Sequence, residues 1–181
     1  KGIEGIEVQC KLVVKHETDV GIIGFPNSGK SSLLQYFSNA QIKIADYPFT
    51  TLQPNLASVK YKECKTIWCD TPAITDKHTS ISLSFAKHLE SCHTLIYCLL
   101  LSENPEEIHE VNIRFIQHQI NVLQRALTNS GIDINSKQNI LVLPRYQFHN
   151  DIYASLQKFG MSIFFQNDEK LLSITYQRIR K

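Results

Sequence analysis

The fold of this chain is decided by the stretch Val20-Gly-Ile-Ile-Gly-Phe-Pro-Asn-Ser-Gly-Lys-Ser31. Its second part, from Gly24 to Ser31, matches the pattern G-x-x-x-x-G-K-[ST] at every fixed position. The apolar residues before the pattern predict a short strand over 20–23, and apolar residues at helical spacing after it predict a helix over 31–40. A glycine-containing loop between a strand and a helix is the context that a phosphate-binding loop requires.

The residue types in this loop suit the binding of phosphate groups. Glycines let the backbone turn its N–H groups inward, and the start of the helix adds the positive end of its dipole. We expect Lys30 to reach the terminal phosphates and Ser31 to hold Mg²⁺. A nucleoside triphosphate is therefore the expected ligand, and a glycine-rich turn without a ligand is the alternative.

Outward from the loop, strand and helix patterns alternate along the chain. Residues 41–54 contain two prolines and paired threonines without periodicity, and they predict an ordered loop. The alternation predicts an α/β fold whose mostly parallel sheet has helices on both faces. Together with the loop motif, it indicates a three-layer sandwich of the P-loop NTPase type. Strands are predicted at 6–12, 55–61, 65–69, 94–101, 139–143 and 161–165, and helices at 80–92, 105–130, 151–159 and from 168.

The longest predicted helix, over 105–130, has signals at both ends. Ser102 or Asn104 is expected to cap its start, and Pro105 lies near its first position. Gly131 lies just past its far end, where glycine commonly ends a helix.

Length and composition limit the class of protein. The 181 residues suit one domain, and the net charge of +2 argues against a domain that binds nucleic acid mainly by neutralising phosphates. The longest apolar stretch, 95–101, is too short for a membrane span, so none is expected. Five cysteines without a C-x-x-C pair favour free thiols over disulfides or a zinc cluster, and His88 and His93 are expected to be structural.

Residues around the loop resemble a known family. Gly24-Phe-Pro-Asn-Ser-Gly-Lys-Ser-Ser-Leu-Leu34, followed by Ile44-Ala-Asp-Tyr-Pro-Phe-Thr-Thr-Leu-Gln-Pro-Asn55, closely resembles the G domain of Obg-type GTPases, and looks most like the mitochondrial members. The opening Gly2-Ile-Glu-Gly-Ile-Glu-Val-Gln-Cys-Lys-Leu12 is similar to the junction between the N-terminal Obg domain and the G domain of that family. The resemblance thus implies a junction over 1–14, after a missing N-terminal Obg domain, and an Obg-type G domain over 15–181.

The resemblance also implies roles for individual residues. Thr50 and Thr51 match the switch I threonines, and we favour Thr51 as the one that coordinates Mg²⁺ and senses the γ-phosphate. Asp70 matches the aspartate that approaches Mg²⁺ through a water, with an exposed loop aspartate as the alternative. Lys30, Thr51 and Asp70 form the implied catalytic set, and Ser31 completes the Mg²⁺ ligands with Thr51 and Asp70. The implied phosphate-binding residues of the loop are Gly24, Pro26, Asn27, Ser28, Gly29, Lys30, Ser31 and Ser32.

The resemblance implies a need for an additional cation. Ile74 lies where Ras-like proteins carry a catalytic glutamine, and the chain has no arginine before Arg114. Some other cation must then stabilise the charge that develops on the phosphates. Related GTPases with asparagine at the position of Asn27 can use K⁺, so K⁺ dependence is a further expectation.

Three departures from the family concern the switch and the base. The glycine of the family's D-x-P-G motif is Ala73, which still offers a backbone N–H to the γ-phosphate but cannot adopt left-handed conformations cheaply. The guanine-reading motif N-K-x-D is replaced by Pro144-Arg-Tyr-Gln147, which costs about two decades of base discrimination. Arg145 and Gln147 remain candidates for contact with the base, and the late S-A motif is not recognisable in 163–168.

The resemblance implies a GTP-binding protein and slow Mg²⁺-dependent GTPase that acts in assembly of the large ribosomal subunit. Its expected partners are GTP, GDP and a large-subunit precursor with its rRNA and ribosomal proteins, and we expect a monomer. The mitochondrial matrix is the expected location, with the nucleolus or cytoplasm as alternatives. A degenerate G domain that docks on the ribosome with weak guanine selectivity, or an ATP-binding variant, remains the alternative function.

Overall fold

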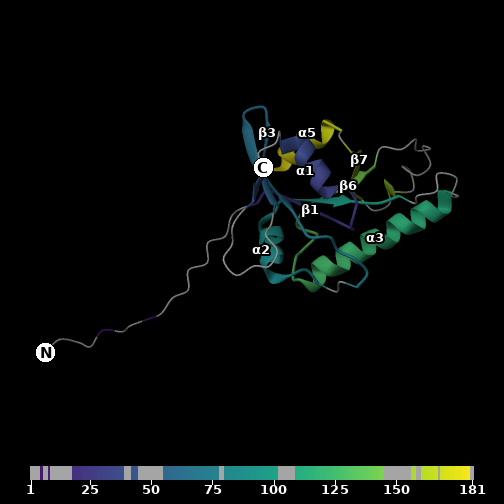
Figure 1. The fold of residues 1–181 in the computed structure, drawn as a ribbon, viewed down its shortest axis with the longest axis horizontal. Coiled ribbons are helices and arrows are strands. Elements are labelled where there is room, and N and C mark those ends of the chain that lie inside the picture. Colours follow the sequence, from purple (N-terminus) through teal and green to yellow (C-terminus); the bar gives the residue numbers. More distant parts are fainter. Residues whose placement is uncertain are drawn as a thin grey trace.

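The computed structural model describes residues 5, 8, 18–38, 42–44, 55–77, 80–101, 109–144, 156–157, 160–166 and 168–179. Its centre is a seven-stranded sheet with the strand order β2-β3-β4-β1-β5-β6-β7 (Figure 1). Helices lie on both faces of this sheet, so the expected α/β sandwich of the P-loop NTPase type is confirmed. The predicted division at residue 14 is not tested, because most of 1–17 lies outside the described residues.

Five strands of the sheet pair in parallel. Two more join one edge of the sheet through antiparallel pairs, β3 with β4 and β2 with β3. The parallel strands are β1 (Val20–Gly24), β4 (Cys64–Asp70), β5 (Thr94–Cys98), β6 (Gln138–Leu143) and β7 (Ser162–Phe165). The antiparallel strands are β3 (Asn55–Tyr61), which forms a hairpin with β4, and β2 (Ile42–Ile44) at the edge.

The strand β2 corrects one sequence prediction. Residues 42–44 lie inside the segment 41–54 that the prolines and threonines predict to be a loop, yet they pair with 55–57 of β3. Three residues are too few to show an alternating pattern, and pairing with β3 is a long-range effect that local sequence does not carry.

Four helices whose bounds lie within the described residues cover the two faces of the sheet. On one face lie α1 (Lys30–Ser38) and α5 (Lys170–Ile179), and on the other α2 (Leu83–Ser91) and α3 (His109–Asn129) (Figure 1). Side chains of each central strand alternate between two cores, as the strand geometry requires. In β5, Leu95 and Tyr97 join the core beneath α2 and α3, whereas Ile96 and Cys98 join the core beneath α1 and α5.

The end of α3 agrees with the sequence. Gly131 has a φ of 79°. The N–H of Ile132 donates to the carbonyl of Leu127 and that of Gly131 to the carbonyl of Thr128, which is the Schellman arrangement. The predicted cap residues at 102–105, and most of the predicted helix 151–159, lie outside the described residues.

The cysteines that the structure describes remain thiols, as expected, because none of Cys64, Cys69, Cys92 and Cys98 forms a disulfide. Among the described residues, no group of three or more His, Cys, Asp or Glu side chains is placed to hold a metal ion. No described helix is long and apolar enough to span a bilayer.

Candidate functional site

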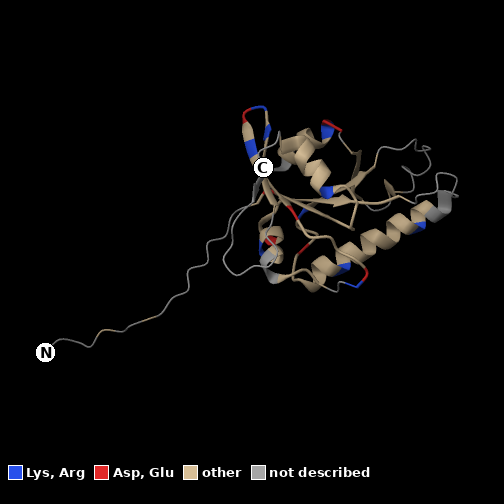
Figure 2. Cartoon of the chain, in the orientation of Figure 1, with Lys and Arg blue, Asp and Glu red and all other residues tan. Residues whose placement is uncertain are grey.

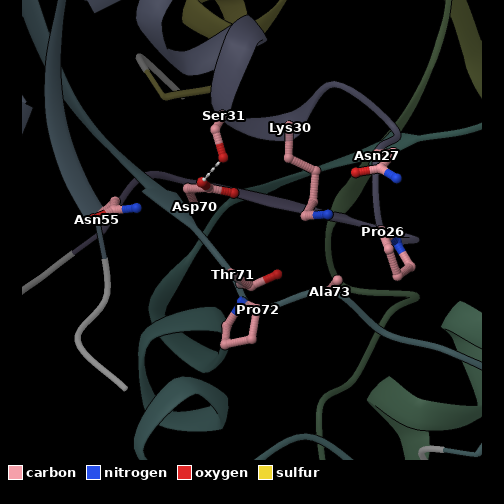
Figure 3. A pocket seen from close by; sticks show the side chains of 9 residues that line it. All are labelled: Pro26, Asn27, Lys30, Ser31, Asn55, Asp70, Thr71, Pro72 and Ala73. Atoms are coloured by element: carbon pink, nitrogen blue, oxygen red, sulfur yellow. Dashed lines mark hydrogen bonds between the residues drawn. The ribbon is translucent and has the colours of Figure 1, made fainter. Parts of the chain in front are cut away.

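A pocket of about 420 Å³ opens at the carboxyl end of the parallel strands, where β1 leads into α1 (Figure 3). Ligands of open α/β sheets commonly bind at this edge. Parallel pairing places Ile22 of β1 beside Asp70 of β4, so the two strands end close together. The residues that line the pocket are Pro26, Asn27, Lys30, Ser31, Asn55, Asp70, Thr71, Pro72 and Ala73.

The backbone of the loop adopts two left-handed conformations. Asn27 has a φ of 60° and Gly29 a φ of 81°. Gly24 lies so close to the neighbouring strand that a Cβ there would collide with the backbone oxygen of Cys98. The first intrahelical bond of α1 runs from Leu33 N to Gly29 O, at 2.8 Å. The N–H groups at the start of α1 therefore face the loop without helical partners, as phosphate binding requires.

Lys30 is the charged group of the loop. It is the first residue of α1 and is 7% exposed, with its Nζ donating to the carbonyl of Phe25 at 2.7 Å. Burial lowers the pKa of Lys30, and the nearby carboxylate of Asp70 opposes this shift. A bound anion beside Lys30 would raise its pKa again, because a nearby negative charge favours the ammonium form.

Ser31 and Asp70 form a compact oxygen pair across the pocket. The Ser31 hydroxyl donates to Asp70 Oδ2 at 2.6 Å (Figure 3). Asp70 Oδ1 is buried and has no hydrogen-bond partner among the described residues. Burial raises the pKa of Asp70, opposed by the Ser31 hydrogen bond, the Lys30 charge and the Asn55 amide.

This oxygen pair fits Mg²⁺. A hydroxyl and a carboxylate are the hard oxygen ligands that Mg²⁺ prefers, and it commonly keeps several waters and takes only one or two protein ligands besides phosphate oxygens. The unpartnered Oδ1 of Asp70 offers an acceptor for such a water. The residues present therefore suit the expected cation.

The segment after β4 is held against the end of β1 by hydrogen bonds. Thr71 donates through both its N–H and its hydroxyl to the carbonyl of Ile22, at 3.1 and 2.8 Å. Ile74 N donates to the carbonyl of Gly24 at 3.0 Å, and its side chain is buried in the core beneath α2 and α3. Ala73, between these anchors, lines the pocket. The Ile74 side chain thus points away from the phosphate site.

The structure brings together part of the set of residues expected from the sequence. Pro26, Asn27, Lys30, Ser31, Asp70 and Ala73 line the pocket, and Gly24, Ser28 and Gly29 belong to its loop. Ser32 is exposed on α1 and does not line the pocket, so its role stays a prediction. Thr50, Thr51, Arg145 and Gln147 lie outside the described residues.

Sequence reasoning missed Asn55, Thr71 and Pro72 as lining residues. Asn55 is the first residue of β3 and pairs with Asp70 in the antiparallel register, which places its amide at the pocket. Its place at the end of the matched segment 44–55 was the only signal in the sequence. Ser28 Oγ is a further buried polar atom without a described partner.

One family model matches residues 19–142, and its description is 50S ribosome-binding GTPase. The match begins just before β1 and ends within β6, so it covers the loop, the pocket and most of the sheet.

Curated relatives with similar sequences are named GTPase Obg. The protein of Chlorobium luteolum is 36% identical over 148 residues, which are 80% of this chain and 40% of that protein. That of Malacoplasma penetrans is 34% identical over an alignment of 195 positions, which covers 98% of this chain and 43% of that protein. The chain therefore spans about two fifths of the length of these relatives.

Solved structures with a similar fold include other G domains. The G domain of the T. maritima FeoB iron transporter matches with a TM-score of 0.57 at 18% identity, covering 91% of this chain and 98% of that one. Aquifex aeolicus Era, in a structure with GDP and AlF4⁻, matches with a TM-score of 0.54 at 18% identity, covering 88% and 56%. At this identity the likeness concerns the fold alone.

Proposed function

Because this chain belongs to the 50S ribosome-binding GTPase family and carries an Obg-type G domain, we propose that it binds GTP and GDP in the pocket between β1, α1 and β4 and hydrolyses GTP slowly. The observation that carries the proposal is the arrangement of Lys30, Ser31 and Asp70 around one pocket at the start of a helix. An ammonium, a hydroxyl and a carboxylate with a free oxygen form a site for a phosphate chain and its cation.

Four residues of the pocket have a defined task in this proposal. Lys30 leaves the carbonyl of Phe25 and neutralises the β- and γ-phosphate oxygens. Ser31 and Asp70 hold Mg²⁺, which when bound supplies positive charge to the phosphates. Ala73 lines the pocket, and its backbone N–H would donate to an oxygen of the γ-phosphate. A water would attack the γ-phosphorus in line, and GDP would leave with the bridging oxygen as inorganic phosphate forms.

The proposed hydrolysis is slow because a water-orienting side chain is missing. Ile74 is apolar and buried, so it cannot orient the attacking water as the glutamine of Ras-like proteins does. We propose that K⁺ beside Asn27 supplies part of the missing charge stabilisation. The left-handed conformation of Asn27 at the rim of the pocket supports this role, since it brings the amide to the phosphate site.

Phosphate release from GTP by the purified chain tests the enzymatic part. We expect slow release that requires Mg²⁺, is faster in K⁺ than in Na⁺, and is lost in Lys30→Ala. Equal rates for the wild type and Lys30→Ala would assign the activity to a contaminant. Binding of GTP without any hydrolysis in K⁺ would contradict the GTPase proposal.

We propose that the chain acts in assembly of the large ribosomal subunit, in the mitochondrial matrix. The family description supports this partner. The location is proposed only from the resemblance of the sequence around the loop to mitochondrial Obg proteins. The β3–β4 hairpin carries exposed Lys60, Lys62 and Lys65 together with the exposed Glu63 (Figure 2), and this excess of positive charge suits contact with RNA phosphates. Thr51 is the proposed sensor of the γ-phosphate, which would couple this contact to the nucleotide.

Sedimentation with large-subunit precursors tests the partner. We expect more binding with a non-hydrolysable GTP analogue than with GDP, and weaker binding when the three hairpin lysines are changed to glutamate. Equal binding in both nucleotide states would contradict a switch.

One observation favours a second candidate function, a ribosome-docking module with weak guanine selectivity or an ATP-binding variant. Pro144, the residue after β6, has neither a side-chain donor nor an acceptor where the family carries the asparagine of its guanine-reading motif. Binding of ATP as tight as that of GTP would favour this candidate.

A further inference from the structure

Asn55 lines the phosphate pocket, but it lies outside the phosphate-loop pattern. It is the first residue of β3, and antiparallel pairing places it opposite Asp70, the last residue of β4. On its other side it pairs with Ile44 of β2, so its backbone is fixed between two strands. The residue is half-buried and shares the pocket with Lys30 and Ser31. The sheet therefore presents the Asn55 side chain to the proposed cation site from a fixed position.

The carboxamide of Asn55 acts on the carboxylate of Asp70. Figure 3 shows the Asn55 side chain directed toward Asp70. Burial raises the pKa of Asp70, and the Ser31 hydrogen bond, the Lys30 charge and the Asn55 amide oppose this shift. A neutral amide has this effect by hydrogen bonding to the charged form of the carboxyl group, which requires that the two groups lie close together.

One oxygen of Asp70 still needs a donor. Oδ2 accepts from the Ser31 hydroxyl at 2.6 Å, whereas Oδ1 is buried and has no hydrogen-bond partner among the described residues. A buried acceptor without a donor is costly, so a ligand that supplies a donor is favoured there. In the proposed site this donor is a water of Mg²⁺, because Mg²⁺ commonly keeps several waters beside protein carboxylates.

A water beside Asp70 Oδ1 has a second proton to donate, and Asn55 supplies an acceptor for it. The carboxamide offers N–H groups to the carboxylate and an oxygen that accepts from the water. A water with two fixed partners keeps one orientation, whereas a water with one partner rotates. Groups that orient the surroundings of a metal in this way tune its affinity without contacting it.

We propose that Asn55 is a positioning residue of the cation site, whose carboxamide orients the Asp70 carboxylate and the water between Asp70 and Mg²⁺. The inference rests on the proposed nucleotide binding. It adds to Ser31 and Asp70 a residue that contacts neither the cation nor the phosphates. The effect of Asn55 is therefore confined to the part of the nucleotide affinity that depends on Mg²⁺.

The Mg²⁺ gain tests this role. We define it as the GDP dissociation constant measured with a chelator divided by the constant measured with Mg²⁺. Asn55→Leu keeps the approximate shape of the side chain but removes its hydrogen bonds. We expect the Mg²⁺ gain to fall about three- to tenfold, while the constant measured with the chelator stays within about twofold. Asn55→Ala should give the same result, and it replaces Asn55→Leu if that variant does not fold.

Asn55→Asp separates orientation of the water from packing. It keeps the length of the side chain and an acceptor oxygen for the water, and its charge attracts the cation. We expect a Mg²⁺ gain at least as large as that of the wild type, although GDP should bind more weakly in the chelator because the added carboxylate repels the phosphates. A loss of Mg²⁺ gain as large as in Asn55→Leu would show that Asn55 does not act through its acceptor oxygen.

The matched control is Ser58→Ala. Ser58 is half-buried in the same strand as Asn55 but does not line the pocket. Both dissociation constants for GDP should therefore stay within about twofold of the wild-type values in this variant.

Three results would overturn the proposal while nucleotide binding stands. The first is an unchanged Mg²⁺ gain in Asn55→Leu and Asn55→Ala. The second is an equal weakening of GDP binding with Mg²⁺ and with the chelator, which would make Asn55 a packing residue. The third is a wild type that binds GDP equally well in both conditions. Failure of the proposed function looks different, because the wild type would then bind no GDP in either condition.

Discussion

At the scale of single residues, Lys30 is the group whose removal should matter most for ligand binding. Its ammonium is held over the pocket by the carbonyl of Phe25. Hydrogen bonds from a charged group contribute about 1.5–3 kcal/mol, so Lys30→Ala should weaken binding of nucleoside diphosphates about ten- to hundredfold. Titration calorimetry measures this loss. Lys65→Ala, which removes an exposed lysine of the hairpin, should leave the affinity unchanged.

Asp70 should govern the Mg²⁺ dependence rather than the folding of the chain. Asp70→Asn keeps an acceptor for the Ser31 hydroxyl but removes the negative charge. We expect the gain in GDP affinity on adding Mg²⁺ to fall at least about tenfold, while affinity without Mg²⁺ stays the same or improves, because repulsion of the phosphates is removed. Titrations with Mg²⁺ and with a chelator measure both quantities, and an unchanged Mg²⁺ effect would exclude Asp70 from the cation site.

The residues of the phosphate site could be largely predicted from sequence because they are close together in the chain. Lys30, Ser31 and Asn27 lie within one pattern, and its spacing encodes their geometry directly. Asn55 was not predicted as a pocket residue, since its position beside Asp70 depends on the pairing of β3 with β4. Contacts that a sheet creates between distant segments leave no trace in local sequence.

At the scale of elements, the end of α3 offers a clean test of backbone conformation. Gly131 has a φ of 79°, and a Cβ there would meet no atom within 4 Å, so only backbone strain opposes a side chain. Gly131→Ala should lower the free energy of unfolding by about 1 kcal/mol, and Gly131→Asn by less, because asparagine tolerates the left-handed region. Denaturant unfolding followed through Trp68 fluorescence measures the difference. A loss above about 3 kcal/mol would point to a packing role that the structure does not show.

Most elements could be predicted in type and approximate place, but their ends could not. The strand predicted over 94–101 ends at Cys98, although the residues after it remain apolar, since Leu99 is buried beyond the strand. The helix predicted from 80 begins at Leu83. Apolar periodicity reports burial, and burial continues past the last residue of the strand: Leu99 is buried and still donates its N–H to the carbonyl of Val142 in β6.

At the scale of the whole molecule, buried thiols should make stability fall at alkaline pH. Burial raises the pKa of Cys92 from 9.0 to about 11 and that of Cys98 from 9.0 to about 12. Between these values the folded state binds more protons than the unfolded state, so the free energy of unfolding decreases as pH rises. The stabilising contribution is complete below pH 9 and is lost by about pH 11 for Cys92, at roughly 1.4 kcal/mol per pH unit.

Chemical denaturation at several values between about pH 8 and pH 11 measures this slope. Cys92→Ser keeps a hydroxyl near the carbonyl of His88, which the thiol contacts at 3.2 Å, but does not titrate in this range. We expect a shallower slope in this variant than in the wild type. Identical slopes would show that Cys92 does not stay protonated in the folded state. The lowered pKa of buried Lys30 acts in the opposite direction in both proteins.

In the molecule as a whole, the residues of the phosphate pocket keep the family's pattern. The segment after β6, where the family reads the base, departs from it. The sheet places the phosphate pocket at β1 and β4, and places Pro144 directly after β6. We therefore expect the phosphates to dominate affinity and the base to contribute less. We also expect Mg²⁺ to be required for tight binding, because Ser31 and Asp70 face the same pocket.

A titration of the purified chain with GTP, GDP and ATP in Mg²⁺ and K⁺, with Lys30→Ala beside the wild type, tests nucleotide binding in this pocket most directly. We expect saturable binding of GTP and GDP that Lys30→Ala weakens about ten- to hundredfold. Absence of nucleotide binding by the folded wild type, or binding that is unaffected by Lys30→Ala, would contradict it.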